Sequence, residues 1–279
     1  MKTCVVIGGG RWGRILAEKF SRLGFAVRVA TEFPSESTDI RRAEIAALVP
    51  APALIYVASR STDHERDFEA AAGLGIPIWV EKNFSVISTP LRERFLSGDN
   101  VLFNQQLFNT SIDQHATLLA KRNNFVIETE VDRPIWTQVG LYDWIGHDLA
   151  LIARLLWLRG VLDANVRCTI EYSPGRCTAR IALAETSFVV VLFESSVRRR
   201  RVLLGDDGIL WSARDGVLRH DPHGLVNTGP VEEEDLLRSS LQVALRTFVG
   251  DQRRLTALSM ALNLAVYPEL PQLTGDHQR

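Results

Sequence analysis

Three side chains in this sequence have the types and the spacing that proton transfer needs. Lys82 directly follows a short apolar run, at the carboxyl end of an expected strand, which is where ligands gather in open α/β sheets. A lysine there can polarise a carbonyl or an imine, or transfer a proton, if its surroundings lower its pKa. Asp143 and His147 are four residues apart, so on a helix both project from one face. A carboxylate that fixes the tautomer of an imidazole is a recurring general-base arrangement.

Each of these residues also has an ordinary structural explanation. A lysine after a strand is commonly solvated, and pairs of Asp and His are common on helix surfaces. Neither the lysine nor the pair identifies an active site by itself, so the prediction depends on the elements that surround them.

A glycine-rich turn near the N-terminus predicts a dinucleotide site. Gly8, Gly10 and Gly13 have GxGxxG spacing and lie between an apolar strand and a stretch compatible with a helix, with Arg11 and Trp12 inside the turn. The first glycine permits the tight turn, the second lets a pyrophosphate approach the backbone, and the third lets helix and strand pack closely. The amide groups that begin the helix then face the anion.

An acidic residue after the second expected strand bears on the choice of cofactor. Glu32 lies 19 residues after Gly13, where a carboxylate can bind the ribose hydroxyls and repel a 2′-phosphate. This position favours NAD(H) mildly, because Arg28, Arg41 and Arg42 are near in sequence and could contact a phosphate instead. An ordinary solvated acid is the alternative for Glu32.

From residue 3 to about 120, short apolar runs alternate with longer stretches compatible with helices. The apolar runs are TCVVIG, AVRVAT, ALIYVAS and PIWVEK, and the helical stretches are RILAEKFSRLG, IRRAEIAALV and HERDFEAAAGLG. This alternation is typical of a parallel sheet covered by helices on both faces. We therefore expect a Rossmann-like, doubly wound α/β domain over residues 1–120, which binds the dinucleotide.

The pattern changes in the second half of the chain. A helix is expected from about Tyr142 to Leu158, and strands at 166–172, 177–184, 186–194 and 198–204, the first from strict alternation of apolar and polar residues. A last helix is expected over about 231–250. Residues 121–279 should form an α+β domain with a mainly antiparallel sheet, which serves substrate binding and oligomerisation and whose C-terminal helix could pack back on the first domain.

The amino-acid composition limits which partners and which cellular compartment we expect. The 32 Lys and Arg residues balance 33 Asp and Glu residues, so we expect a small-molecule substrate and neither nucleic acid nor a membrane as partner. From the glycines that follow the short apolar run at the N-terminus we expect no secretion signal, and Cys4, Cys168 and Cys177 fit free thiols in a reducing compartment, so we expect a cytoplasmic protein. The second face of the antiparallel sheet predicts a homo-oligomer, a dimer or a tetramer. No metal site is expected, since His220 and His223 flank a proline in an apparent exposed turn.

With these motifs together and in this order, the sequence resembles the Gfo/Idh/MocA oxidoreductases over nearly its whole length. The resemblance is carried by VVIGGGRWG, LIYVASRSTDH, IPIWVEKN, LYDWIGHDLALIARLL and GPVEEEDLLRSSLQVALRTFVGD. It implies an NAD(P)-dependent enzyme that transfers a hydride between nicotinamide and a small alcohol or carbonyl compound, such as a sugar or a polyol.

The resemblance also implies roles for residues. Lys82 takes the position of the catalytic lysine, Asp143 and His147 those of the family's Asp and His pair, and Ser59 and His64 those that line the cofactor loop. The expected cofactor-binding residues are Gly8, Gly10, Arg11, Trp12, Gly13, Glu32, Ser59, Arg60, His64 and Glu81. The expected substrate-pocket residues are Gln106, Trp136 and Trp144.

Departures from the family pattern keep two other functions open. Asn83 stands where the family usually has proline, Ala150 where it commonly has an acid, and Gln106 near where members often carry arginine. The segment between 104 and 140 is also short for the family. A changed pocket would suit an imine reductase or a tailoring reductase of a specialised metabolite. Asn83 also leaves open a catalytically silent dinucleotide-binding sensor or assembly subunit.

Overall fold

The computed structural model describes most of the chain in two compact units. The described residues are 1–30, 37–48, 52–60, 63–81, 101–104, 122–131, 138–161, 165–183, 185–194, 200–205, 208–214, 217–220, 241, 245 and 249–270. The first unit takes Met1–Gln105 with Ala244–Thr256, and the second takes Gln106–Val243 with Ala257–Arg279.

A parallel sheet forms the centre of the first unit. Its five strands lie in the order β2-β1-β3-β4-β5, and every neighbouring pair is parallel. The strands are β1 (Thr3–Ile7), β2 (Ala26–Ala30), β3 (Leu54–Val57), β4 (Ile78–Glu81) and β5 (Val101–Asn104), and the helices between them are α1 (Arg11–Arg22), α2 (Thr38–Leu48) and α3 (His64–Ala72). This confirms the expected doubly wound α/β sheet.

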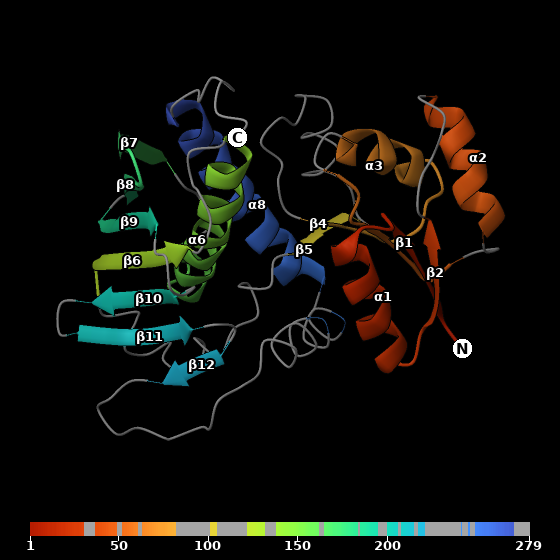
Figure 1. Ribbon diagram of the computed structural model, residues 1–279, viewed down its shortest axis with the longest axis horizontal. Helices are drawn as coiled ribbons and strands as arrows, with labels where there is room; N and C mark the ends of the chain where they lie inside the picture. Colours follow the sequence, from red (N-terminus) through yellow and green to blue (C-terminus); the bar gives the residue numbers. More distant parts are fainter. Residues whose placement is uncertain are drawn as a thin grey trace. The chain divides into compact units, whose positions relative to one another are not determined.

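Helices cover both faces of this sheet. The helix α1 lies on one face, while α2 and α3 lie together on the other (Figure 1). All four residues of β3 are buried, as are four of the five in β1, which agrees with their continuous apolar sequences. Phe20 of α1 packs against Tyr56 and Trp79 on one side of the sheet, with ring centroids 5.7 and 6.1 Å away.

The strand order places a topological switch point at the carboxyl ends of β1 and β3. The chain passes from β1 to β2 on one side, and then returns to place β3 on the other side of β1. Connections therefore diverge at the carboxyl ends of β1 and β3, and such a switch point is where open α/β sheets bind ligands. The glycine turn follows β1 at this point, and Ser59 follows β3.

The second unit contains a mainly antiparallel sheet, as expected. Its strands lie in the order β12-β11-β10-β6-β9-β8-β7, and only β6 and β9 are parallel among the neighbouring pairs described. The strands are β6 (Asn124–Val131), β7 (Val166–Ser173), β8 (Arg176–Leu183), β9 (Thr186–Glu194), β10 (Arg200–Gly205), β11 (Gly208–Arg214) and β12 (Val217–His220). Tyr172 pairs with Cys177 across the hairpin, so Cys168 lies further along the strand, and all three cysteines are free thiols.

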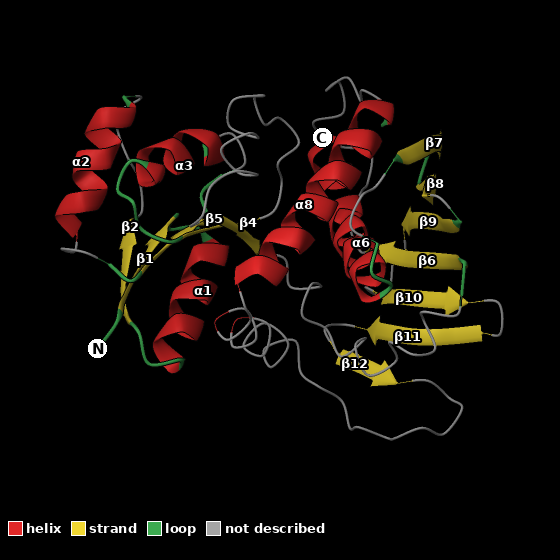
Figure 2. Cartoon of the chain, turned by 180° about the vertical axis from the view of Figure 1, so that it is seen from behind, coloured by secondary structure: helices red, strands yellow, loops and turns green. Residues whose placement is uncertain are grey.

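The helix α6 (Gln138–Leu158) lies on one face of this sheet and packs on β9 (Figure 2). A second helix, α8 (Val249–Val266), leads into a 3₁₀ turn at Tyr267–Glu269 that contacts β7, and the residues of α8 up to Thr256 belong to the first unit. The sequence predicted α6 from about Tyr142, four residues late. Residues 149–153, 155 and 156 are all buried, so α6 is covered nearly all round at its centre.

The C-terminal part of the chain contains a helix that the sequence did not predict. A last helix was expected over about 231–250, most of which lies outside the described residues, and the residues described there are helical: Leu241, Leu245, Val249 and Gly250. The helix α8 continues from Val249 to Val266. Polar residues are distributed around this helix, with Thr256, Ser259 and Asn263 buried and Leu264 exposed, so the period-3.6 contrast between two faces is weak and gave no helix signal there. No helix within the described part of the chain has the length and apolarity needed to cross a bilayer.

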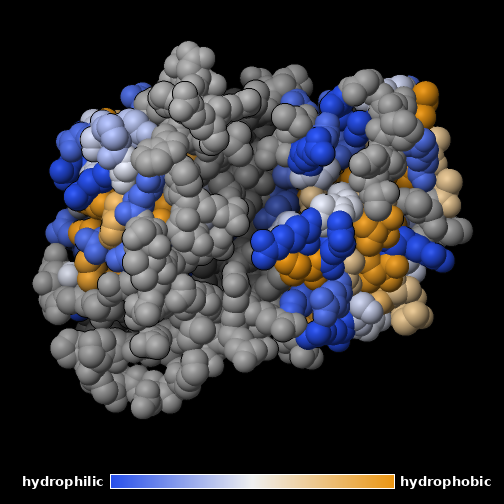
Figure 3. Space-filling view, viewed as in Figure 1, coloured by the Kyte–Doolittle hydropathy of each residue, from blue (hydrophilic) through white to orange (hydrophobic). Residues whose placement is uncertain are grey.

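Among the described residues, the exposed large apolar side chains do not form a patch. They are Met1, Ile40, Leu245 and Leu264, which lie in different parts of the chain. Figure 3 shows hydrophilic residues interspersed with apolar ones over the part of this face that is coloured. Scattered apolar residues of this kind are normal on a protein surface.

Candidate cofactor and active site

The turn after β1 is held against the loop after β3. Gly8 has φ +119°, a conformation that side chains with a Cβ rarely adopt, and a Cβ at this position would lie 2.4 Å from the carbonyl oxygen of Ala58. The Gly8 amide donates a hydrogen bond to the carbonyl of Ala30 at 2.8 Å, and the Ala58 amide donates one to Ile7 at 2.7 Å. The turn is therefore tied to the ends of both strands that flank β1.

The other two glycines of the motif differ from each other. A Cβ on Gly13 would lie 1.7 Å from the carbonyl oxygen of Gly8, so only glycine allows α1 to pack this closely on the turn. Gly10 has ordinary dihedral angles, φ −64° and ψ −178°, and a Cβ there would meet nothing within 4 Å. Gly10 is thus not required by packing, and the open space beside it is available to a ligand.

The beginning of α1 suits an anion. Gly10 is the N-cap and provides no side-chain hydrogen bond to the first amides of the helix, which also carries no acidic residue in its first turn. The Arg14 side chain donates from Nε to the carbonyl of Gly9 at 3.1 Å and so fixes the turn from outside. Arg11 is exposed. Free amides and the positive end of a helix dipole together form a site for a phosphate group.

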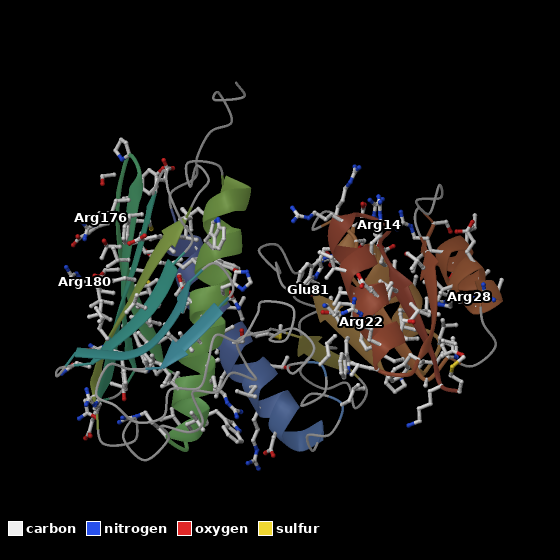
Figure 4. The ribbon with its side chains drawn as sticks, turned by 60° about the horizontal axis from the view of Figure 1, so that its bottom comes forward. Arg14, Arg22, Arg28, Glu81, Arg176 and Arg180 are labelled. Carbon is white, nitrogen blue, oxygen red and sulfur yellow. The ribbon has the colours of Figure 1, made fainter. Side chains whose placement is uncertain are left out.

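Glu81 joins three elements at the end of β4. Its Oε2 accepts one hydrogen bond from Nε1 of Trp12, at 2.9 Å, and another from the Tyr56 hydroxyl, at 2.6 Å. Trp12 belongs to the first turn of α1, and Tyr56 to β3. Glu81 is only 7% exposed and lies beside α1 (Figure 4). The sequence gave no indication of this contact, since Trp12 and Glu81 are 69 residues apart.

His64 fixes the loop that follows β3. Its ring is buried, and Nε2 lies 2.7 Å from the carbonyl oxygen of Ser59, so Nε2 carries the hydrogen and donates it. Burial lowers the pKa of His64 to about 4, against the opposing effects of the Ser59 carbonyl and of Asp63. His64 is therefore neutral at neutral pH, and it holds Ser59 in place as a hydrogen-bond donor. Arg60, the next residue, is exposed.

We expect His64 to make the protein less stable in mild acid. The folded protein resists protonation of His64 until about pH 4, whereas the unfolded chain binds that proton near pH 6.5. The contribution to stability is complete above pH 6.5 and is lost as the pH falls to about 4, by about 3 kcal/mol. His64→Gln retains a donor but does not titrate, so urea unfolding between pH 7 and pH 4.5 should show a shallower loss. Equal loss in both proteins would contradict the role of His64, because all other groups titrate alike in them.

A buried ion pair ties α2 to α3 behind this loop. Arg41 and Asp67 are 4% and 1% exposed, and Nη1 of Arg41 contacts Oδ1 of Asp67. Burial raises the pKa of the Asp67 carboxyl, while the Ser59 hydroxyl and Arg41 act in the opposite direction. Asp67 of α3 is thus linked to α2 through Arg41. Arg41 was considered as a phosphate contact from sequence, but its guanidinium is instead engaged inside the domain.

The helix α6 carries the expected histidine in the second unit. Trp144 and His147 are one turn apart, their ring centroids are 6.1 Å apart, and both side chains are partly exposed. The backbone of Asp143 lies in α6, four residues before His147, whereas its side chain lies outside the described residues. The spacing places Asp143 and His147 on the same side of the helix.

Asp148, which the sequence did not single out, follows His147 directly. It is fully buried, and its Oδ1 accepts a hydrogen bond from the hydroxyl of Thr129 on β6, at 3.0 Å. This bond fixes the helix to the sheet at the level of the histidine. A fully buried acid is rare unless it is paired, but burial cannot be read from an isolated Asp in a helical sequence.

Four expected site residues lie outside the described part of the chain. They are Lys82, Glu32, Gln106 and Trp136. Among those described, the structure groups Gly8, Gly13 and the Ala58–Ser59 backbone in one place, and joins Trp12 to Glu81 in another. His147 and Trp144 belong to the second unit and are described there by themselves.

Comparison with known proteins identifies the fold. No family model matches the chain, and neither does the sequence of a curated protein. Solved structures match nearly its whole length. A myo-inositol dehydrogenase from Corynebacterium glutamicum is 14% identical with a TM-score of 0.64, and the match covers 95% of this chain and 96% of that one. The chain has the fold of the Gfo/Idh/MocA dehydrogenases.

Two other structures with this fold support the same result. UDP-N-acetylglucosamine 3-dehydrogenase GnnA from Acidithiobacillus ferrooxidans is 19% identical, with a TM-score of 0.61 over 96% of this chain and 99% of that one. GenD2 from gentamicin A biosynthesis, solved in complex with NAD, is 14% identical, with a TM-score of 0.56 over 95% and 93%. The Gfo/Idh/MocA resemblance predicted from the sequence is confirmed at the level of the fold.

Proposed function

We propose that the protein is an NAD(P)-dependent oxidoreductase that transfers a hydride between nicotinamide and a small alcohol or carbonyl compound, such as a sugar or a polyol. The observation that carries this proposal is the open space at Gly10. The turn is closed by packing at Gly8 and Gly13 and open at Gly10, where a pyrophosphate would approach, beside amides that lack a side-chain cap, at a switch point of the sheet.

The names of the structural neighbours support the class of substrate. One is a myo-inositol dehydrogenase, another acts on UDP-N-acetylglucosamine, and GenD2 was solved with NAD. At 14–19% sequence identity, what this chain shares with these proteins is the fold. That the substrate is an alcohol or a carbonyl compound is therefore our proposal.

Three residues would perform the proton chemistry. When bound, the nicotinamide supplies or accepts the hydride. Lys82 polarises or protonates the oxygen on the reacting carbon, and His147 exchanges the proton of that oxygen. Asp143 orients the imidazole of His147. Glu32 favours NAD(H) over NADP(H), because its carboxylate would lie near the 2′ position and repel a phosphate there.

A panel of substrates tests this proposal. NADH oxidation and NAD⁺ reduction are followed by absorbance with sugars, polyols, ketones and cyclic imines, and the same panel is repeated with NADP(H). Turnover of an alcohol or a ketone supports the proposed reaction, whereas turnover of imines alone identifies an imine reductase. Cofactor binding without turnover of any compound identifies a silent binding protein, the outcome that Asn83 leaves open. A tenfold preference for NADP(H), about 1.4 kcal/mol, would contradict the role of Glu32.

We also propose that a second copy of the chain pairs with the outer face of the second sheet. Arg167, Thr169, Glu171 and Ser173 of β7 are exposed at alternate positions, and Arg176 and Arg180 of β8 point away from α6 (Figure 4). Arg180 Nε lies 3.7 Å from Glu171, and both side chains are more than half exposed. Charges of both signs on one face can complement themselves about a two-fold axis.

Charge reversal tests this pairing. The substitution Arg180→Glu places two acids side by side on the proposed face, and we expect it to convert dimers or tetramers into monomers in sedimentation velocity at low salt. Lys2→Glu, a reversal on the exposed N-terminus of the first unit, is the control and should not change the oligomeric state. A wild-type protein that sediments only as a monomer would contradict the proposal.

A further inference from the structure

One carboxylate oxygen binds the cofactor turn to the two neighbouring strands. Oε2 of Glu81 accepts from Trp12 and from Tyr56, so α1, β3 and β4 meet at a single atom. Tyr56 is fully buried and Glu81 nearly so. Hydrogen bonds to a charged acceptor are about twice as strong as those between neutral groups, and burial reduces the competition from water.

The position of Trp12 connects this contact to the proposed cofactor site. Trp12 is the second residue of α1, between Arg11 and Gly13, so its backbone amide is one of the uncapped amides at the helix start. A bond from its indole to Glu81 fixes the direction in which this first turn presents its amides. The opposite side of α1 is already fixed by the close packing of Gly13 on Gly8.

The strands that carry the other two residues cannot shift independently. Tyr56 pairs with Trp79 in the β3–β4 ladder, and Glu81 lies two residues beyond Trp79 at the end of β4. Glu81 is therefore attached to a rigid part of the sheet, and the first turn of α1 is attached to Glu81.

We propose that Glu81 is a positioning residue of the cofactor site, which acts through Trp12 and Tyr56 without touching the cofactor. It holds the first turn of α1 so that the amides near Gly10 fit a pyrophosphate. This inference rests on the proposed function, and it changes the role that the sequence suggested for Glu81, which was direct contact with the cofactor. Among the described residues, those of this network are Trp12, Tyr56 and Glu81.

A double-mutant cycle separates the two roles. If Glu81 acts through Trp12, then Glu81→Ala and Trp12→Phe remove the same interaction, and the double variant should bind no more weakly than the worse single variant. If Glu81 instead contacts the cofactor, the two effects should multiply. Each single variant is expected to weaken binding roughly tenfold, the loss typical of one charged hydrogen bond.

The ligand measured is ADP-ribose, by isothermal titration calorimetry, with NADH in parallel. ADP-ribose carries the pyrophosphate but no nicotinamide, so its binding does not depend on catalysis or on the substrate. Glu81→Gln keeps an oxygen acceptor for both donors and should restore most of the affinity lost in Glu81→Ala, which a general loss of stability would not do. Tyr56→Phe should give a smaller loss, because the bond between Trp12 and Glu81 remains.

Phe20→Leu provides the matched control. It removes buried aromatic packing beside Tyr56, so it should lower the free energy of unfolding, but it leaves every hydrogen bond of Glu81 in place. Its affinity for ADP-ribose should equal that of the wild type. Multiplying effects in the cycle, unchanged binding in Glu81→Ala, or equal weakening in Phe20→Leu would each overturn the inference while leaving the proposed function intact. A wild-type protein that binds neither ADP-ribose nor NADH would overturn both.

Discussion

Gly10→Val should fold as the wild type does and lose its affinity for NADH. Gly10 has dihedral angles that valine can adopt, and a Cβ there meets nothing within 4 Å. The substitution should therefore change the free energy of unfolding little. The same side chain would occupy the space through which a pyrophosphate approaches the backbone. We expect the fluorescence titration with NADH to show no saturation, with an unfolding midpoint close to that of the wild type.

Gly13→Ala is the matched control for this experiment. Its Cβ would lie 1.7 Å from the backbone oxygen of Gly8, so α1 or the turn must move, at a cost of about 1–3 kcal/mol or more. This variant should unfold at lower denaturant concentration, which Gly10→Val should not. A normal NADH titration in Gly10→Val would show that the cofactor does not lie over this turn. Strong destabilisation of Gly10→Val would show instead that the space beside Gly10 belongs to the fold.

Lys82→Met should bind NADH normally and turn over substrate 10²–10⁴ times more slowly, the range that a proton-transferring group typically contributes. The lost interaction acts mainly in the transition state, so kcat should fall much more than cofactor affinity. His147→Asn should lose activity in the same range, and Asp143→Asn should lose less if Asp143 only orients the imidazole. Rates are measured with the best compound of the substrate panel, by absorbance of the nicotinamide.

Lys2→Met controls for the loss of a lysine. The sequence has only four lysines, Lys2, Lys19, Lys82 and Lys121, and Lys2 is exposed at the start of the same unit. It should leave kcat unchanged. A Lys82→Met variant with kcat within threefold of the wild type would remove Lys82 from the mechanism. So would a structure with cofactor bound in which the Lys82 amine and the His147 ring are more than about 10 Å apart, beyond hydrogen-bond reach.

The parts that sequence could predict are those with local signals. The glycine turn, the buried parallel strands and the hairpin between β7 and β8 each depend on residues within about ten positions of one another, and the register of Tyr172 with Cys177 follows from the turn alone. The contacts that complete the site join distant residues. Trp12 and Glu81 are 69 residues apart, and Arg41 and Asp67 are 26 apart. No periodicity in the sequence encodes such pairs, because they depend on how whole elements pack.

In the second unit, too, the features that the sequence did not predict depend on contacts between distant residues or lack a local pattern. Residues 124–131 alternate in burial as a strand should, but their place between β9 and β10 is set by two pairings with later segments. The helix α8 has polar and apolar residues on all sides, so its sequence lacks the contrast between two faces that identifies a helix. Nothing in the sequence distinguishes Asp148 from an exposed acid, and only the fold brings it within hydrogen-bond distance of the Thr129 hydroxyl.

The place of β6 also determines when the second sheet can form during synthesis. β6 ends at Val131, whereas its neighbours β9 and β10 begin at Thr186 and Arg200. At about 5–20 residues per second, a ribosome needs roughly 3–11 s to reach the start of β9 after β6 has been made. During that time the emerging β6 has neither of its ladder partners, while β7 and β8 are made and can already pair with each other. The sheet therefore cannot assemble in the order in which its strands are translated, and its central strand is among the last to be enclosed.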